Sequence, residues 1–388
     1  SNGKTPKTGR ASDYHGLTRD DLLRAYRTMV LSRKIDDKEI QLKNQSQAFF
    51  QISGAGHEAI LVAAGNHLGA GHDWFYPYYR DRALCLVLGM TPLEMLLRAV
   101  GSKNDPNSSG RQMPSHWGHT KLNIVSQSSP TGTQCLQAVG CAEATQLYDR
   151  ITGIADRESK YRPDEVTYMS IGDGATSEGE FWEALNTACT RKLPLVILVE
   201  DNGYAISVPV AVQTPGGNVS RLVESFPNLR VFRCDGTDYL ASHRTMREAT
   251  AFARERKGVA FVHATVIRPY SHSLSDDEKL YKTAAEREAE ARRDPITRMQ
   301  HFLKAEGLAT DDELTAMPKD IEHEINAAAD AALAAPKPLP EEAMAFVFSP
   351  DVDPTSPAFE TEPNPEGKAD TMVSAINRTM KDEMARDP

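Results

Sequence analysis

The chain has 388 residues and 40% of them are hydrophobic, so it can bury a substantial core as one large α/β domain or as two smaller ones. Its formal net charge of −10 argues against nucleic acid as a partner, because nucleic acid is attracted by positive charge. The net charge does not exclude a local basic patch for an acidic partner. No apolar run reaches membrane-spanning length and the polar start lacks the apolar centre of a signal peptide, so we expect a globular enzyme without nucleic-acid or membrane partners.

The five cysteines are odd in number, show no CxxC spacing and mostly lie in apolar segments. This pattern indicates buried, reduced thiols, because structural disulfides belong to oxidising compartments. We therefore expect a cytoplasmic protein. The cysteines are Cys85, Cys135, Cys141, Cys189 and Cys234.

We expect residues 1–16 to form a flexible N-terminal segment and the first helix to begin near Arg19, with Thr18 as its cap. Apolar residues recur at helical spacing from Leu22 to Ile35. This spacing is typical of a helix that packs one face against a core.

A turn at residues 49–54 leads into a second helix, and His57 lies at its start. This histidine either faces a ligand or is an ordinary helix-start residue, and its residue type alone favours the second interpretation. The next stretch, HDWFYPYYRDR, joins aromatic rings to arginines before another helix. Tyr79 and Arg80 have the groups that grip a phosphate through paired hydrogen bonds, but an aromatic interface with surface arginines fits the same pattern.

Residues 101–127 are rich in Ser, Asn, Gly and His and predict a long ordered loop. His116 and His119 invite a zinc interpretation, which is poor because no further Cys or His accompanies them at structural-site spacing. The polar turn SSPTGTQ then runs into a helix of small residues. Its oxygens suit a monovalent cation or an aminopyrimidine edge, and an ordinary helix cap from Ser129 or Thr133 explains the same residues.

The centre of the chain is a predicted strand-helix-strand unit. The apolar run Val166–Ile171 predicts a buried parallel strand that ends at a Gly-Asp-Gly turn, residues 172–174. We expect a helix after this turn, capped by Thr176 or Ser177. A second apolar strand, Leu193–Val199, follows the helix.

This unit delivers Asp173 and Asn202 to the carboxyl end of one sheet. A carboxylate oxygen, an amide oxygen and the nearby Tyr204 carbonyl form a hard oxygen set that suits Mg²⁺ and leaves positions for ligand phosphates. The helix N-terminus favours the same anion. GDG alone also occurs in turns for backbone reasons, but joined to EDNGYAIS after the next strand it becomes a strong signal for such a site.

Beyond this unit, strands at 230–234 and 259–267 flank a helix at 238–256. Alternating strands and helices predict an α/β fold with a doubly wound, mostly parallel sheet. Arg268 and His272, in RPYSHSLSDDEK, either bind a phosphate oxygen or belong to a solvated polar turn. Further helices are expected at 282–293, 295–307 and 311–335.

These motifs resemble a known family. GDG followed by Asn202 is similar to the thiamine diphosphate fingerprint, and GATSEGE and DNGYAIS resemble the α part of 2-oxoacid dehydrogenase E1 components. Within that family the likeness is greatest to branched-chain 2-oxoacid dehydrogenases. The resemblance covers most of residues 17–336.

The resemblance implies a thiamine diphosphate-binding fold over residues 17–335. The implied reaction is oxidative decarboxylation of a 2-oxoacid, with the acyl group passed to lipoamide on a partner E2. Mg²⁺ would be held by Asp173, Asn202 and the Tyr204 carbonyl, and His272 would occupy a catalytic position. A potassium-binding loop would comprise Ser128, Pro130, Thr133 and Gln134. The implied cofactor contacts are Tyr79, Arg80, Ser129, Gly172, Asp173, Gly174, Ala175, Asn202, Arg268 and His272.

Residues 336–368 are rich in proline and acidic residues, as expected of a linker, and residues 369–388 resemble the opening helix of the E1 β part. We therefore form the hypothesis of a native α–β fused chain. By resemblance the β part supplies a glutamate and a histidine to the active site, so this chain alone is expected to be inactive. The resemblance also implies a dimer or an α2β2-like assembly.

Two alternatives stay open. A pyruvate or acetoin dehydrogenase E1 would share the same metal fingerprint. A non-catalytic module that binds Mg²⁺ and a diphosphate would also explain these motifs, without the decarboxylation chemistry.

Overall fold

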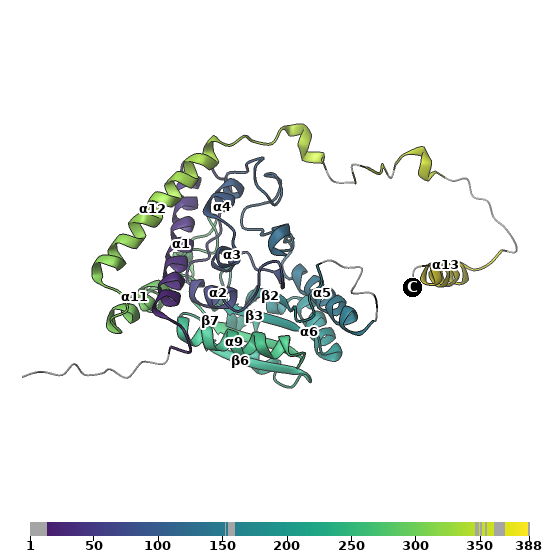
Figure 1. Ribbon diagram of the computed structural model, residues 1–388, viewed down its shortest axis with the longest axis horizontal. Helices are drawn as coiled ribbons and strands as arrows, with labels where there is room; N and C mark the ends of the chain where they lie inside the picture. The colour runs from purple at the N-terminus through teal and green to yellow at the C-terminus, as the bar shows by residue number, and fades with distance from the viewer. Residues whose placement is uncertain are drawn as a thin grey trace, which may run out of the picture. The chain divides into compact units, whose positions relative to one another are not determined.

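The computed structural model describes residues 14–151, 153, 160–345, 349, 351–353, 355–360 and 369–386. Its contacts divide the chain into two units, Ser1–Pro338 and Leu339–Pro388. The first unit holds the sheet and most of the helices (Figure 1). No helix in the described ranges combines the length and the apolar character that crossing a bilayer requires.

The sheet of the first unit is parallel, with the strand order β1-β2-β3-β7-β6. Its strands are β1 (Trp74–Tyr76), β2 (Thr167–Gly172), β3 (Leu195–Asp201), β6 (Leu229–Asp235) and β7 (Val259–Thr265). Every residue of β2 and β3 is buried, as expected for apolar strands covered on both faces. The predicted mostly parallel, doubly wound α/β sheet is confirmed, whereas the edge strand β1 was not predicted.

Side chains of successive strand residues enter different cores. In β3, Val196 and Leu198 join one core, while Leu195, Ile197 and Val199 join the other. The helices of the first core are α1 (Arg19–Asn44), α2 (Glu58–Gly65), α3 (Arg82–Leu88), α4 (Pro92–Ala99), α9 (Tyr239–Arg254), α11 (Pro295–Ala305) and α12 (Asp311–Ala334). Those of the second are α5 (Thr133–Arg150), α6 (Gly179–Arg191) and α8 (Val219–Leu222). Figure 1 shows α12 alongside α1 and α4, which it contacts.

Shorter elements complete the first unit. A two-stranded antiparallel ribbon follows β3, formed by β4 (Tyr204–Ala205) and β5 (Val208–Pro209). The short helices are η1 (Thr120–Leu122), η3 (Gly174–Ser177), α7 (Val210–Gln213), η4 (Pro215–Gly217), η5 (Glu278–Leu280) and α10 (Ala284–Ala291).

Two predicted helix starts have different outcomes. Thr18 caps α1 in a reciprocal capping box with Asp21, as predicted. The predicted cap of the central helix is wrong, because α6 begins only at Gly179 and its N-cap, Glu178, makes no side-chain cap bond. The Thr176 hydroxyl instead donates to the Asp173 carbonyl at 2.7 Å, within η3.

The second unit contains η6 (Pro340–Met344), η7 (Pro357–Phe359) and α13 (Met372–Arg386). The helical periodicity predicted near the C-terminus is therefore present as a helix. α13 buries no residue, and its large apolar side chains are exposed. These side chains are Met372, Val373, Ile376, Met380 and Met384.

Candidate functional site

The carboxyl ends of β2 and β3 bring the predicted metal ligands together. Gly172 pairs with Glu200 in the parallel register, so the residues that follow these strands lie side by side. The Asn202 backbone N–H donates to Asp173 Oδ1 at 3.3 Å, and Asn202 Oδ1 accepts from the Tyr204 N–H at 3.2 Å. Two oxygen-bearing side chains and the Tyr204 backbone thus meet at one edge of the sheet.

The two glycines beside Asp173 are required by close approach. A Cβ at Gly172 would lie 2.7 Å from the Tyr78 hydroxyl, and a Cβ at Gly174 would lie 2.8 Å from the Ala205 Cβ. Neither glycine has a positive φ. The sequence therefore places glycine here because neighbouring segments leave no room for a side chain, and not because the turn needs left-handed backbone.

Asp173 is a buried carboxyl group with an unused oxygen. It is 1% exposed, and in the described part of the chain its Oδ2 has no hydrogen-bond partner. Burial, with repulsion from Asp201, raises the pKa of Asp173 to about 7. A carboxylate in this setting favours a cation, and carboxylate and amide oxygens, as Asp173 and Asn202 offer, are ligand types that Mg²⁺ prefers.

A cavity of about 280 Å³ opens beside Asp173. Of the predicted cofactor and metal residues, Tyr79, Gly172, Asp173, Gly174, Ala175, Tyr204 and His272 line this cleft. The predicted residues that do not line it are Arg80, Ser129, Asn202, Arg268 and the four potassium ligands, Ser128, Pro130, Thr133 and Gln134. The structure adds Tyr78, Thr131, Glu178, Ala205 and Ile206 to the lining. Ala205 and Ile206 belong to the EDNGYAIS motif but were not predicted as lining residues, and they reach the cleft through the β4–β5 ribbon.

Arg80 is buried and fixes His272 at the wall of the cleft. Its Nη2 donates both to the His272 carbonyl and to His272 Nδ1, each at 3.2 Å. Its Nε donates to the Tyr78 hydroxyl at 3.3 Å, and its Nη1 donates to the Ser53 carbonyl. Burial and the charges of Arg80 and Arg268 lower the pKa of His272 to about 4. The imidazole is therefore neutral at neutral pH, and because Nδ1 accepts from Arg80, Nε2 carries the proton.

Arg268 is a second buried guanidinium with unused donors. Its Nη2 donates to the Ile206 carbonyl at 2.8 Å and to the Tyr281 hydroxyl at 2.5 Å. Its Nε and Nη1 are buried without a partner among the described residues. Burial and the nearby Arg80 charge lower the pKa of Arg268. Buried donors and two neighbouring cations favour an anion at this place.

The predicted aminopyrimidine and potassium residues lie at the start of α5. Ser129 is exposed and its hydroxyl lies 3.0 Å from His116 Nε2. Gln134 Nε2 donates to the Ser170 carbonyl at 3.1 Å, so this amide links α5 to β2. Thr133 is the first residue of α5, and its N–H donates to the Pro130 carbonyl at 3.3 Å. The half-buried Ser128 precedes this turn.

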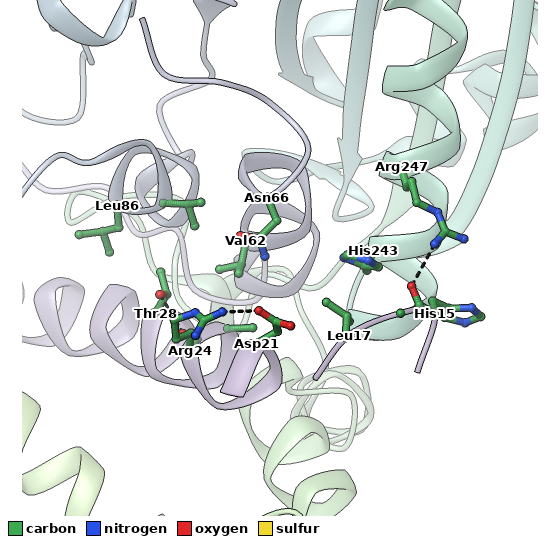
Figure 2. A pocket seen from close by; sticks show the side chains of 13 residues that line it. His15, Leu17, Asp21, Arg24, Thr28, Val62, Asn66, Leu86, His243 and Arg247 are labelled. Carbon is green, nitrogen blue, oxygen red and sulfur yellow. Dashed lines mark hydrogen bonds and ion pairs between the residues drawn. The ribbon is translucent and has the colours of Figure 1, made fainter. Parts of the chain in front are cut away.

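A larger cavity, of about 550 Å³, lies between α1, α2, α3 and α9 (Figure 2). It shares no lining residue with the cleft beside Asp173. Its charged groups are engaged within the chain: Arg24 pairs with Asp21, and Arg247 donates to the His15 carbonyl. None of its lining residues has a buried polar atom without a partner. The smaller cleft is therefore the better candidate site.

Comparison with known proteins agrees with this geometry. Residues 26–341 match the family described as "Dehydrogenase E1 component". The chain is 35% identical over 336 residues to the 2-oxoisovalerate dehydrogenase subunit alpha of Bacillus subtilis (strain 168), covering 86% of this chain and 97% of that protein. It is 32% identical over 342 residues to the 3-methyl-2-oxobutanoate dehydrogenase subunit alpha of Mycobacterium tuberculosis (strain ATCC 25618 / H37Rv), covering 87% and 85%. It is 30% identical over 314 residues to the pyruvate dehydrogenase E1 component subunit alpha of Mycoplasma pneumoniae (strain ATCC 29342 / M129 / Subtype 1), covering 80% of each.

Proposed function

Because the chain belongs to the dehydrogenase E1 component family, as an α-type chain of a 2-oxoacid dehydrogenase, we propose that its cleft holds thiamine diphosphate with Mg²⁺ for decarboxylation of a branched-chain 2-oxoacid. The resemblance inferred from GDG and EDNGYAIS is thereby confirmed at the level of the family. The observation that carries the proposal is the buried Asp173 Oδ2, which lies beside Asn202 and has no hydrogen-bond partner among the residues that the structure describes.

The residues at the cleft fit this cofactor. Asp173, Asn202 and the Tyr204 carbonyl would hold Mg²⁺. The Nε and Nη1 donors of Arg268, which have no partner in the described part of the chain, would offset the diphosphate charge. The neutral His272 would offer Nε2–H at the cleft wall, held in that tautomer by Arg80. Bound thiamine diphosphate supplies the electron sink that 2-oxoacid decarboxylation needs. The chain's own contribution is to bind and orient, while Tyr78 and Tyr79 wall the cleft.

The relatives are named alpha subunits, which supports a β part as partner. We propose an assembly of paired α and β parts and a lipoyl-bearing E2 as the acyl acceptor. The turn at Ser128, Pro130, Thr133 and Gln134 would take K⁺. All five cysteines are free thiols, which supports a reducing, cytoplasmic setting.

The first experiment measures thiamine diphosphate binding by isothermal titration calorimetry, with the chain and its β part together, in Mg²⁺ and in EDTA. We expect binding that needs Mg²⁺ and that Asp173→Ala abolishes. Glu178→Gln is the matched control, because it removes a cleft carboxylate that the proposal does not use as a metal ligand. Unchanged affinity in Asp173→Ala would refute the metal assignment.

The second experiment compares substrates. Steady-state decarboxylation by the α and β parts together is measured with 3-methyl-2-oxobutanoate and with pyruvate. We expect kcat/KM to favour the branched substrate. The pyruvate dehydrogenase alpha subunit among the relatives makes pyruvate the second candidate, and a kcat/KM that favours pyruvate would establish it instead.

A further inference from the structure

His57 is a buried histidine that the proposed function leaves without a role. It lies at the N-cap position of α2 but makes no side-chain cap bond, so helix capping does not explain it. Its side chain is 0% exposed. Its Nδ1 lies 2.6 Å from Glu200 Oε2, and its Nε2 is buried without a partner among the described residues.

Glu200 ties this histidine to the strand ends that form the site. It is a fully buried residue of β3, two positions before Asn202 and paired in register with Gly172. Its carboxyl group also contacts that of Asp81, and within the described ranges each of the two groups has an oxygen without a hydrogen-bond partner. Glu200 is therefore in contact with Asp81 on one side and with His57 on the other.

The same polar network reaches β2. The Ser170 hydroxyl donates to Asp81 Oδ2 at 2.5 Å and accepts from the Tyr78 N–H at 2.8 Å. Ser170 lies in β2, three residues before Asp173. The network therefore joins the start of α2, the end of β3, the start of α3 and the strand β2 beneath the cleft.

The segment before His57 is packed too closely to shift. A Cβ at Gly54 would lie 2.6 Å from the Arg80 carbonyl oxygen, and a Cβ at Gly56 would lie 2.2 Å from that of Ile267. Gly56 also has a φ of +91°, which favours glycine. The backbone before His57 therefore packs against Arg80 and against Ile267, the residue before Arg268.

We infer that His57 is a positioning residue for the metal site: through its bond to Glu200 it sets the end of β3, and so the placement of Asn202 against Asp173. This inference rests on the proposed function, because it is the Mg²⁺ and diphosphate affinity that His57 would govern. When residues that hold metal-binding side chains in place are mutated, metal affinity typically falls by about 10- to 100-fold.

The test titrates Mg²⁺ at saturating thiamine diphosphate, by calorimetry, with the chain and its β part together. His57→Leu removes the bond to Glu200, whereas His57→Asn keeps a polar nitrogen near the position of Nδ1. We expect His57→Leu to raise the Kd for Mg²⁺ by about 10- to 100-fold and His57→Asn to stay within about threefold of the parent, a difference of less than 1 kcal/mol. His243→Leu, which removes a buried imidazole away from the cleft, is the control.

An unchanged Kd in His57→Leu overturns the inference. So does a His57→Asn variant as weak as His57→Leu, because the loss then does not depend on the Glu200 bond. If His57→Leu does not fold, His57→Phe replaces it, since it keeps a ring of similar breadth without the nitrogen. Parent protein without Mg²⁺-dependent binding, or Asp173→Ala that binds normally, would instead refute the proposed function, so the two failures are distinguishable.

Discussion

Replacing Asp173 by Asn should stabilise the metal-free protein while it destroys the metal site. Asn has nearly the same shape, and its side-chain oxygen can still accept from the Asn202 N–H as Asp173 Oδ1 does. What the substitution removes is a buried negative charge. Asp173 is 1% exposed, and burial, with repulsion from Asp201, raises its pKa from 3.8 to about 7.

The size and sign of the effect follow from linkage. A carboxyl group whose pKa is higher in the folded than in the unfolded protein lowers the free energy of unfolding once the pH exceeds the unfolded pKa. This loss grows with pH and levels off above the folded pKa. For a rise from 3.8 to about 7, the cost is about 1 kcal/mol at pH 4.5 and about 4 kcal/mol at pH 8. Asp173→Asn avoids this cost, so its advantage should widen by about 3 kcal/mol between these pH values.

The assay is urea unfolding of parent and Asp173→Asn at pH 4.5 and pH 8 in EDTA. The difference in unfolding free energy at each pH is the quantity compared, because other groups titrate alike in both proteins. A second titration, with Mg²⁺ and thiamine diphosphate, should show that only the parent gains stability from the ligands. An advantage that stays constant from pH 4.5 to pH 8 would refute the assignment of a raised pKa to Asp173.

Three further substitutions test packing and buried charge. Gly174→Ala places a Cβ 2.8 Å from the Ala205 Cβ and should cost about 1–3 kcal/mol in urea unfolding. Gly140→Ala, within α5 and with no atom within 4 Å of its new Cβ, should gain up to about 1 kcal/mol, and a loss there equal to that of Gly174→Ala would contradict the packing argument. Arg82→Met removes the cation that donates to Glu39 at 2.9 Å in the core, and should cost about 3–5 kcal/mol. A cost below about 1 kcal/mol would show that Glu39 is neutral without it.

The strand-helix-strand unit was predictable because its signals are local. The apolar runs before residue 172 and before residue 200 are long enough to be strands, and parallel strands place their carboxyl ends at one edge. Asp173 and Asn202 were therefore expected to meet, and the structure brings them within hydrogen-bond distance through the Asn202 backbone. The residue pattern and the sheet topology thus both place Asp173 and Asn202 at the same edge of the sheet.

Two features were not predictable because their causes are not local. β1 is only three residues long, and its aromatic residues are as typical of a packed wall as of a strand, so its pairing with β2 decides its structure. The start of α6 is displaced because the Thr176 hydroxyl bonds to the Asp173 carbonyl and a short 3₁₀ turn intervenes. Ala205 and Ile206, which follow the predicted Tyr204, line the cleft because the β4–β5 ribbon lies against Gly174, a contact that residue spacing does not encode.

Buried carboxyl oxygens that lack a hydrogen-bond donor among the described residues mark the site independently of any motif. In the described part of the chain, three carboxyl groups have a buried oxygen without a hydrogen-bond donor: Asp81, Asp173 and Glu200. All three are connected to the carboxyl ends of β2 and β3, since Asp81 bonds to Ser170 and contacts Glu200. An unsatisfied buried polar group costs about 1–3 kcal/mol. Because Asp81 and Glu200 contact each other, Asp173 Oδ2 is the oxygen of these three groups that is left for a ligand. The Asp173 carboxylate lies near Arg268, whose Nε and Nη1 have no partner among the described residues, so this edge suits both a cation and an anion.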